Sequence, residues 1–201
     1  MSPFIVLEGG EGSGKSTQAR LLRNQLLKLG LPVLLTREPG GTSVGNRLRR
    51  WIKWGGEVTP QTELMFLLAA RSQLVTEVVR PAIDSSTIAI CDRYAYSTFA
   101  YQGYGRGMDL EFLETLNNFV TSGLLPDLVV LMDVDPEQGL RRKGKTRDKF
   151  EREGVAFHRR VREGYLKMAA EEPERWLLID AGLARKEIRQ RIWQRVERLL
   201  G

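Results

Sequence analysis

Short apolar runs alternate along this chain with longer stretches in which apolar residues recur every three or four positions. The apolar runs span residues 4–7, 33–35, 87–90, 128–132 and 176–179. They are almost unbroken, as is typical of strands that are covered on both faces in a parallel sheet. The pattern therefore predicts an α/β fold with five central parallel strands.

The segments between these runs have the spacing of one-faced helices. The repeating apolar positions near the two ends of the chain are Ala19, Leu22, Leu26, Leu29 and Ile188, Ile192, Val196, Leu199. A third helix is expected to begin after Thr59, because threonine caps helices and Pro60 suits the first helical position. It is expected to reach Val79 and to bend or end at Arg80-Pro81.

Residues 141–149 are nearly all basic or polar and offer no apolar side chain to bury, which predicts a mobile loop. There is no repeat of fixed period and no linker long enough to divide the chain. Residues 1–201 are therefore expected to form one domain.

The composition, with 42% hydrophobic and 28% charged residues, is that of an ordinary globular protein and excludes collagen-like and disordered classes. The balance of 31 Lys and Arg against 25 Asp and Glu gives +6, which is compatible with anionic partners of several kinds. One cysteine, Cys91, and one histidine, His158, exclude an internal disulfide and a Cys/His metal cluster. The lone thiol favours the reducing cytoplasm, and neither a signal peptide nor a membrane span is expected.

A phosphate-binding motif follows the first predicted strand directly. Residues 9–17 satisfy the pattern G-x-x-x-x-G-K-[ST] of the P-loop. They are Gly9, Gly10, Glu11, Gly12, Ser13, Gly14, Lys15, Ser16 and Thr17. Glycines let successive N–H groups converge on phosphate oxygens, Lys15 serves the β- and γ-phosphates, and Ser16 serves Mg²⁺. A strand before the motif and an amphipathic helix after it predict binding of a nucleoside triphosphate.

Two further strands end in an arginine beside a carboxylate, Arg37-Glu38 and Asp92-Arg93. The carboxyl edge of a parallel sheet is where ligands bind, and two guanidinium groups there match a second phosphate. The alternative is that Arg37 and Arg93 form structural ion pairs with the adjacent carboxylates.

Several segments together resemble bacterial thymidylate kinases, which transfer the γ-phosphoryl group of ATP to dTMP. They include R-E-P-G-G-T at 37–42, A-A-R at 69–71, D-R-Y at 92–94 and A-Y-Q-G at 100–103. The resemblance covers nearly the whole chain. It implies a three-layer α/β/α P-loop kinase with a five-stranded parallel sheet, a mobile lid at about 141–149, a Mg²⁺ cofactor and a cytoplasmic homodimer that makes dTDP for dTTP synthesis.

The same resemblance assigns roles to individual residues. It implies that Arg37 and Arg93 bind the dTMP phosphate, and that Arg71, helped by Thr98, bonds to the thymine edge. It places Glu11 at the 3′-hydroxyl and Tyr101 against the 2′ position, where a ribose hydroxyl would collide. The substrate-binding set that it implies is Glu8, Glu11, Arg37, Phe66, Leu67, Arg71, Arg93, Ser97, Thr98, Tyr101 and Gln102.

The resemblance further implies that Glu8, Asp92 and Ser16 organise Mg²⁺, and that the catalytic residues are Lys15, Asp92, Arg93 and Arg147. Some relatives carry a catalytic arginine inside the P-loop, where this chain has Gly12. A lid arginine is therefore expected. Arg147 is favoured over Arg141 and Arg142, because residues 147–151 align best with the segment that follows the lid in relatives. The alternative is that this basic run is only a solvated loop.

The chain departs from its relatives at the base-stacking position, which holds Leu67 and has the aromatic Phe66 beside it. A shift of one residue turns a helical side chain by about 100°. Phe66 is thus a candidate for the core, and Leu67 a candidate to cover the base.

Two other functions are compatible with the motifs. One is a P-loop kinase for another nucleotide or a deoxynucleoside, and the other is a nucleic-acid-binding ATPase, suggested by the net charge and the basic residues at 47–50.

Trp51 and Trp54 beside that cluster are expected to pack on a helix face, and no stable nucleic-acid partner is expected. His158 is expected at the surface, and Cys91 is expected to pack at the end of a buried strand.

Overall fold

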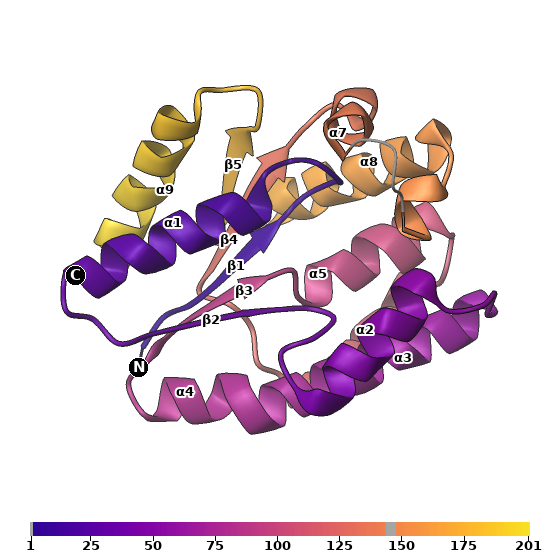
Figure 1. Ribbon diagram of the computed structural model, residues 1–201, viewed down its shortest axis with the longest axis horizontal. Helices are drawn as coiled ribbons and strands as arrows, with labels where there is room; N and C mark the ends of the chain where they lie inside the picture. The colour runs from indigo at the N-terminus through magenta and orange to yellow at the C-terminus, as the bar shows by residue number, and fades with distance from the viewer. Residues whose placement is uncertain (1, 144–147) are drawn as a thin grey trace.

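The computed structural model describes residues 2–143 and 148–201 and has the predicted three-layer α/β/α architecture (Figure 1). Five parallel strands form one sheet in the order β2-β3-β1-β4-β5. Their bounds are β1 Phe4–Glu8, β2 Val33–Arg37, β3 Ile88–Asp92, β4 Leu128–Asp133 and β5 Trp176–Asp180. All five predicted strands are therefore confirmed.

Each strand runs one or two residues past its predicted apolar run and ends in a charged residue. The pairing of Arg37 with Asp92 and of Leu7 with Asp92 brings three of these ends to one edge of the sheet. Coverage on both faces is confirmed for β1, β3 and β4 but is wrong for β2 and β5. These two strands lie at the sheet edges, where the helical layers end, so Leu178 of β5 remains 52% exposed.

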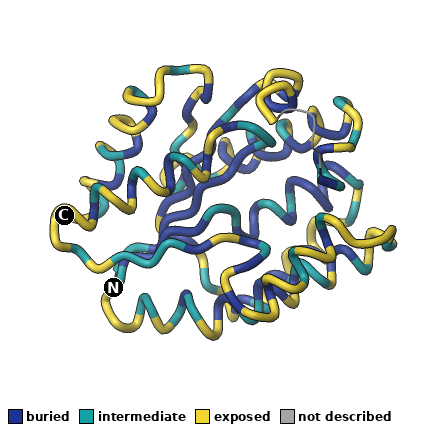
Figure 2. The backbone as a smooth tube through the Cα atoms, in the orientation of Figure 1, coloured by how far each residue is buried: buried dark blue, intermediate teal, exposed yellow. Residues whose placement is uncertain are grey.

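Helices cover both faces of the sheet, and Figure 2 shows the buried strands between partly exposed helices. One face packs against α1 Lys15–Lys28 and α9 Arg185–Leu200. The other face carries the π-helical turns η1 Val75–Val79 and η2 Phe99–Gly105 and the helix α8 Val155–Glu171. The remaining helical elements are α2 Ser43–Trp54, α3 Pro60–Leu74, α4 Arg80–Asp84, α5 Ala95–Thr98, α6 Leu110–Thr121, α7 Pro136–Lys143 and η3 Phe150–Arg152.

The predicted helix after Thr59 begins as expected, since the Thr59 hydroxyl accepts a hydrogen bond from the Thr62 N–H at 3.2 Å. It does not end at Pro81. Instead α3 passes through η1 into α4, which continues to Asp84. Proline removes one N–H and crowds the preceding turn, and the wider π-helical turn just before Pro81 accommodates both effects.

The predicted loop at 141–149 is corrected in part. Residues 141–143 form the last turn of α7, whose start is capped by the Asp135 carboxylate through the N–H groups of Glu137 and Gln138. Asp148, at the other end of the predicted loop, is buried and accepts a hydrogen bond from Lys53 of α2. Arg147, the favoured lid arginine, lies outside the described residues.

Two predictions for single side chains are wrong. His158 is 4% exposed, because it shares the inward face of α8 with Phe157, Val161 and Tyr165 while the neighbouring arginines face outward. Trp54 is 58% exposed and does not pack as expected.

Trp51 is also more than half exposed, although its ring contacts Phe66 at a centroid distance of 6.3 Å. The burial of Cys91 in its strand is confirmed. Within residues 2–143 and 148–201, no helix has the length and apolar character needed to span a membrane.

The contrast between Leu26 and Leu27 on α1 tests the packing of α1 and α9 on the sheet. Leu26 is fully buried in this core and Leu27 is 43% exposed. Leu26→Ala is expected to lower the free energy of unfolding by about 2–5 kcal/mol, because it removes buried methyl groups and leaves a cavity. Leu27→Ala, the matched control, is expected to change it by less than about 1 kcal/mol. Urea unfolding followed by circular dichroism measures both, and equal losses would contradict this packing.

Candidate active site

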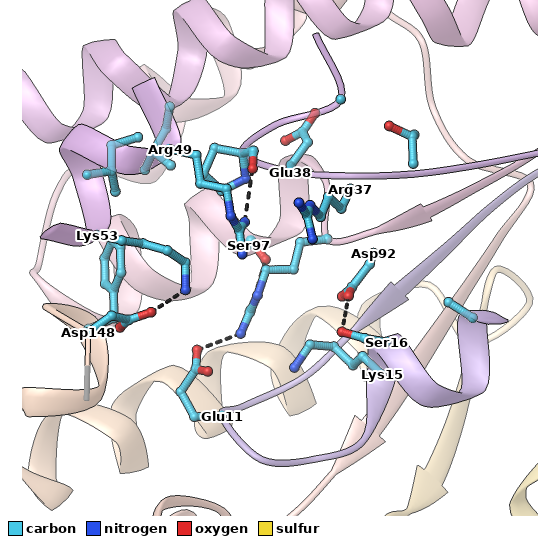
Figure 3. A pocket seen from close by; sticks show the side chains of 18 of the residues that line it. Glu11, Lys15, Ser16, Arg37, Glu38, Arg49, Lys53, Asp92, Ser97 and Asp148 are labelled. Atoms are coloured by element: carbon cyan, nitrogen blue, oxygen red, sulfur yellow. Dashed lines mark hydrogen bonds and ion pairs between the residues drawn. The ribbon is translucent and has the colours of Figure 1, made fainter. Parts of the chain in front are cut away.

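A cavity of about 730 Å³ opens at the carboxyl edge of β2, β1 and β3. Its walls come from the P-loop, the end of β2, the helices α2 and α3, the segment from Asp92 to Gln102, and residues on both sides of positions 144–147. This volume suits a small-molecule ligand. Figure 3 shows Arg37 and Arg49 entering it from the side opposite Lys15.

The P-loop lies directly against the first turns of α7. Gly12 has φ +67°, and a Cβ atom built there would lie 2.1 Å from the carbonyl oxygen of Gly139. A Cβ atom on Gly139 would in turn lie 2.2 Å from the carbonyl oxygen of Glu11. Position 12 therefore has no room for an arginine, which gives a physical reason why this P-loop does not supply one.

Lys15 is buried and folds back on the P-loop. Its ammonium group donates to the carbonyl oxygens of Gly9 at 2.8 Å and Gly10 at 2.7 Å, and to the Ser13 hydroxyl at 3.1 Å. Burial and the charge of Arg93 lower the pKa of Lys15 to about 8, against the opposing pull of nearby carboxylates. A bound phosphate would favour the charged form and raise this pKa again.

The Ser16 hydroxyl donates a hydrogen bond to the Asp92 carboxylate, across from the start of α1 to the end of β3 (Figure 3). Hydroxyl and carboxylate oxygens are suitable Mg²⁺ ligands, and Mg²⁺ commonly takes only one or two protein carboxylates and completes its shell with water and phosphate. In the described part of the chain, no three His, Cys, Asp or Glu side chains gather as a metal cluster. Ser16 and Asp92 thus fit a Mg²⁺ ion that is shared with a bound nucleotide.

Glu8, expected near Mg²⁺ and substrate, has a different place. Its fully buried carboxylate accepts hydrogen bonds from the N–H groups of Tyr94 and Ser97 and from the hydroxyls of Ser97 and Tyr165, at 2.7 to 3.1 Å. Glu8 is not among the residues that line the cavity. Glu8 thus holds the backbone turn that carries Arg93, and its part in organising Mg²⁺ and substrate stays a prediction.

Arg93 occupies the left-handed region with φ 73°, which is uncommon for a side chain of this size. Its guanidinium bonds to Glu11 at 2.6 Å, to the Tyr101 hydroxyl at 3.1 Å and to the Gly9 carbonyl oxygen at 3.1 Å. Burial alone would raise the pKa of Glu11, but Arg93, Lys15 and Lys143 outweigh it and hold this pKa well below its usual range. Glu11 is therefore ionised at the centre of the cavity.

Arg49 also lines the cavity, and sequence reasoning missed it. Its guanidinium donates to the Pro39 carbonyl oxygen at 3.0 Å. Burial and then the charge of Arg37 lower its pKa, and Arg93 adds to the same effect. Several arginines that repel one another around one space are favourable for an anion. The available signal was the spacing of Arg49 and Lys53, which lie one turn apart on the same face of α2.

The described part of the chain does not contain an ion pair between Arg93 and the adjacent Asp92, which was the alternative interpretation of this motif. Arg93 pairs with Glu11 and not with its neighbour Asp92, and Glu38 pairs with Arg71 at 2.7 Å. Arg71 is 2% exposed, and the partners of its N–H groups are Glu38, Thr98, Asn117 and the Tyr94 carbonyl oxygen. A bond from Arg71 to thymine would thus require one of these partners to be exchanged.

Gln102, a residue of the cavity wall, has a buried hydrogen-bond acceptor. Its amide nitrogen donates to Glu63 at 3.2 Å, and the Glu63 carboxylate also pairs with Arg106 and Lys149. A carboxylate can only accept, so the amide oxygen of Gln102 must face away from Glu63. That oxygen is buried and has no hydrogen-bond partner. An N–H group of a ligand would satisfy it.

The structure also separates the two candidates for covering the base. Leu67 lines the cavity, whereas Phe66 is not among the lining residues and contacts Trp51. Phe66 as a base-stacking residue is therefore corrected, because the two side chains leave α3 in different directions.

Tyr101 lines the cavity with its ring edge-on to Phe150 at 5.6 Å. Its hydroxyl donates to Glu11 at 2.8 Å, so the tyrosine fixes the carboxylate besides shaping the space. Of the predicted residues, those that line this one cavity are Glu11, Gly12, Ser13, Gly14, Lys15, Ser16, Thr17, Arg37, Leu67, Arg71, Asp92, Arg93, Ser97, Thr98, Tyr101 and Gln102. Gly9 and Gly10 are not among the lining residues, but their carbonyl oxygens accept hydrogen bonds from Lys15.

Comparison with known proteins agrees with this geometry. Residues 7–192 match the family model described as thymidylate kinase. The chain belongs to the thymidylate kinase family. It is 49% identical to thymidylate kinase of Dehalococcoides mccartyi strain CBDB1, over 100% of this chain and 98% of that one. It is 43% identical to the enzyme of Herpetosiphon aurantiacus, over 96% and 94% of the two chains.

A solved structure shares the fold of this family member closely. The crystal structure of thymidylate kinase from Ehrlichia chaffeensis superimposes with a TM-score of 0.82 at 31% identity, covering 98% of both chains. The resemblance inferred from the sequence motifs and the predicted P-loop kinase fold are thereby confirmed.

The lowered pKa of Lys15 generates a test of the P-loop. Because bound phosphate restores the ammonium form, binding of Mg-ATP at pH 8.5 is expected to take up roughly half a proton or more, and the uptake should fall toward zero at pH 7. Affinity should weaken as the pH rises through about 8. Calorimetry in buffers of different ionisation enthalpy measures the uptake, with Lys15→Ala as the control. Equal uptake at pH 7 and 8.5 would contradict this account.

Proposed function

We propose that this protein transfers the γ-phosphoryl group of ATP to dTMP and forms ADP and dTDP, as the names of its relatives suggest. The observation that carries the proposal is a single cavity with two anion-binding ends. Lys15 and the P-loop supply one end, and Arg37, Arg49 and Arg93 supply the other. A donor and an acceptor phosphate bound in this way would face each other across a space of small-molecule size.

The donor end uses the P-loop backbone and Lys15 for the triphosphate. We propose that Ser16 and Asp92 hold Mg²⁺, which neutralises phosphate charge when it is bound. The start of α1 adds the partial positive charge of a helix N-terminus to the same phosphates. On binding, Lys15 would exchange its bonds to the carbonyl oxygens of Gly9 and Gly10, and Ser16 its bond to Asp92, for contacts with the phosphates and the metal ion.

The acceptor end separates phosphate, sugar and base. The three arginines would hold the phosphate, while Glu11 would bond to the 3′-hydroxyl and Tyr101 would crowd the 2′ position. Leu67 would cover the base by apolar contact, with Thr98 and Arg71 nearby. The buried oxygen of Gln102 would accept the imide N–H of thymine, which the ring nitrogen of cytosine lacks, since an unpaired buried acceptor opposes a base that offers no donor.

Catalysis in this arrangement is mainly positioning and charge neutralisation. Arg93 is fixed by Glu11 and the Gly9 carbonyl oxygen at the junction of the two ends, where it would serve the acceptor phosphate next to the donor. The competing proposal of a nucleic-acid-binding ATPase has no support from the relatives, and Arg49 of the basic cluster lines the cavity. The predicted cytoplasmic location fits a nucleotide kinase.

An assay of ADP release with each nucleoside monophosphate tests the function. Turnover is expected with dTMP, at a kcat/KM at least about tenfold above that for dCMP and for the ribose form of dTMP, since pocket contacts of this kind are worth roughly 1.4 kcal/mol or more. Lys15→Ala is expected to lower kcat by about 10²- to 10³-fold without unfolding the protein. A preference for another monophosphate would overturn the choice of acceptor.

We propose in addition that the protein forms a homodimer through α3 and α6. Three large apolar side chains stand out from these helices: Phe119 is 82%, Phe112 54% and Met65 47% exposed. Phe112 and Phe119 lie two turns apart on one face of α6, and α6 packs beside α3. An exposed apolar face of this kind is typical of a protein–protein interface.

Phe119→Asp is expected to convert the dimer to monomers, because it would bury a charge in an apolar interface. Size-exclusion chromatography with light scattering gives the mass of each species. Leu29→Asp, at the exposed end of α1, is the matched control and should leave the mass unchanged. A wild-type protein that is monomeric at micromolar concentration would contradict the proposal.

A further inference from the structure

The cation that reaches the P-loop from α7 is Lys143. Its ammonium lies 3.6 Å from Glu11 Oε2 and 2.7 Å from Glu151 Oε1, and the residue lines the cavity. The two arginines before it on α7 are placed differently. Arg142 also lines the cavity, but its guanidinium donates to the carbonyl oxygen of Ala181 at 3.1 Å, whereas Arg141 is exposed and is not among the lining residues.

Glu151, the closer partner of Lys143, is itself fixed. It is 4% exposed, its Oε2 accepts a hydrogen bond from the Asp148 N–H at 3.1 Å, and its own N–H donates to Asp148 Oδ1 at 3.1 Å. This reciprocal pair is the arrangement of a capping box and closes the turn over residues 148–151. Glu151 therefore presents one oxygen, Oε1, to Lys143 from a rigid support.

The same turn is tied to the helices that form the opposite wall of the cavity. The second oxygen of Asp148 bonds to the ammonium of Lys53 on α2, and Figure 3 shows this contact across the cavity from the Ser16–Asp92 contact. The Lys149 N–H donates to the Lys53 carbonyl oxygen at 3.3 Å, and the Lys149 ammonium lies 2.8 Å from Glu63 of α3. A chain of hydrogen bonds and ion pairs thus leads from Lys53 of α2 through Asp148, Glu151 and Lys143 to Glu11.

We propose that Glu151 is a positioning residue, which holds the Lys143 ammonium beside the P-loop so that it meets the phosphoryl group in transfer, and that the Lys53–Asp148 contact makes this placement depend on the acceptor-side helix α2. The inference rests on the proposed function. It assigns the cation to α7 and not to the arginine favoured from the sequence, Arg147.

The two distances indicate how Lys143 could bind a substrate and still be held by Glu151. Glu11 is already bonded to Arg93 and Tyr101, and its contact with Lys143 is the longer one. An incoming phosphoryl oxygen can replace Glu11 as the second partner while Glu151 keeps the first. A charge that is fixed in advance needs little reorganisation in the transition state, which is where preorganised groups contribute most.

Lys53 gives the arrangement its link to the acceptor. It lies one turn after Arg49 on α2, the helix whose arginine faces the proposed acceptor phosphate. When α2 sits against the cavity, Lys53 holds Asp148 and through it Glu151. The position of the cation therefore depends on α2, the helix that also carries Arg49.

The experiment compares kcat and the KM for dTMP in wild type, Glu151→Gln, Lys143→Met and the double variant. Glu151→Gln and Lys143→Met are each expected to lower kcat at least about tenfold and to leave the KM for dTMP within about twofold. The double variant is expected to be no slower than the slower single variant, because Glu151 acts through Lys143. Glu151→Asp should restore part of the loss.

The matched control is Glu137→Gln, the same substitution in the exposed Glu137–Arg159 pair that joins α7 to α8. It is expected to leave kcat within about twofold of wild type, as exposed pairs contribute little. Lys53→Met is expected to lower kcat less than Glu151→Gln does. Added to the Lys143→Met variant, Lys53→Met is expected to cause no further fall in kcat.

Unchanged kcat in Lys143→Met would overturn the inference, and this variant remains informative if Glu151→Gln does not fold, because Lys143 is partly exposed. Losses that multiply in the double variant would also overturn it, since they would mean that Glu151 acts independently of Lys143. Wild-type activity reports on the proposed function separately. If wild type prefers another monophosphate, the acceptor assignment fails and the same ratios are measured with that acceptor. If it phosphorylates none, both proposals fail.

Discussion

The ion pair between Glu11 and Arg93 is the contact on which the rest of the site depends. At 2.6 Å it joins the P-loop to the turn after β3, and the two charges are largely removed from water. Such a pair is costly to break, because each partner would be left as a buried, uncompensated charge. Tyr101 bonds to both partners, and Lys143 approaches the carboxylate from α7, so four separate segments take their positions from this one pair.

The surroundings of the pair carry an excess of positive charge that the protein alone does not balance. The pKa of Lys15 falls to about 8 through burial and Arg93, and the pKa of Arg49 falls through burial and the charge of Arg37. Both shifts show cations that lack a full set of anionic partners. Phosphate groups of a bound nucleotide would supply such partners and would raise both pKa values.

Close packing fixes the distance between the two sides of the donor end. Gly12 and Gly139 leave no space for side chains between the P-loop and α7, and the carbonyl oxygens of residues 11 and 139 occupy the positions where Cβ atoms would lie. The last turn of α7, with Lys143, is thereby held near the phosphate site. On the far side of the cavity, Lys53 and Glu63 hold the segment after position 147. The described parts of the predicted lid are thus tied to both walls.

The sequence by itself determined the sheet, the P-loop and about half of the residues that line the cavity. Apolar runs define strands because both faces of the central strands must be covered, and the motif residues follow those strands directly along the chain. These are local patterns, so they can be read without knowing which distant segments meet. The helix start at Thr59 is of the same kind.

Tertiary structure alone decided the hydrogen-bond and ion-pair partners of the charged side chains. Glu8 bonds to donors far away in sequence, and Arg71 donates to Glu38, Thr98 and Asn117. His158 faces inward on a helix rich in arginine. The pairing of Lys143 with Glu151 and of Lys53 with Asp148 has no local signature. A charged side chain can pair with any opposite charge that the fold brings within reach, and only the packing of the helices selects one.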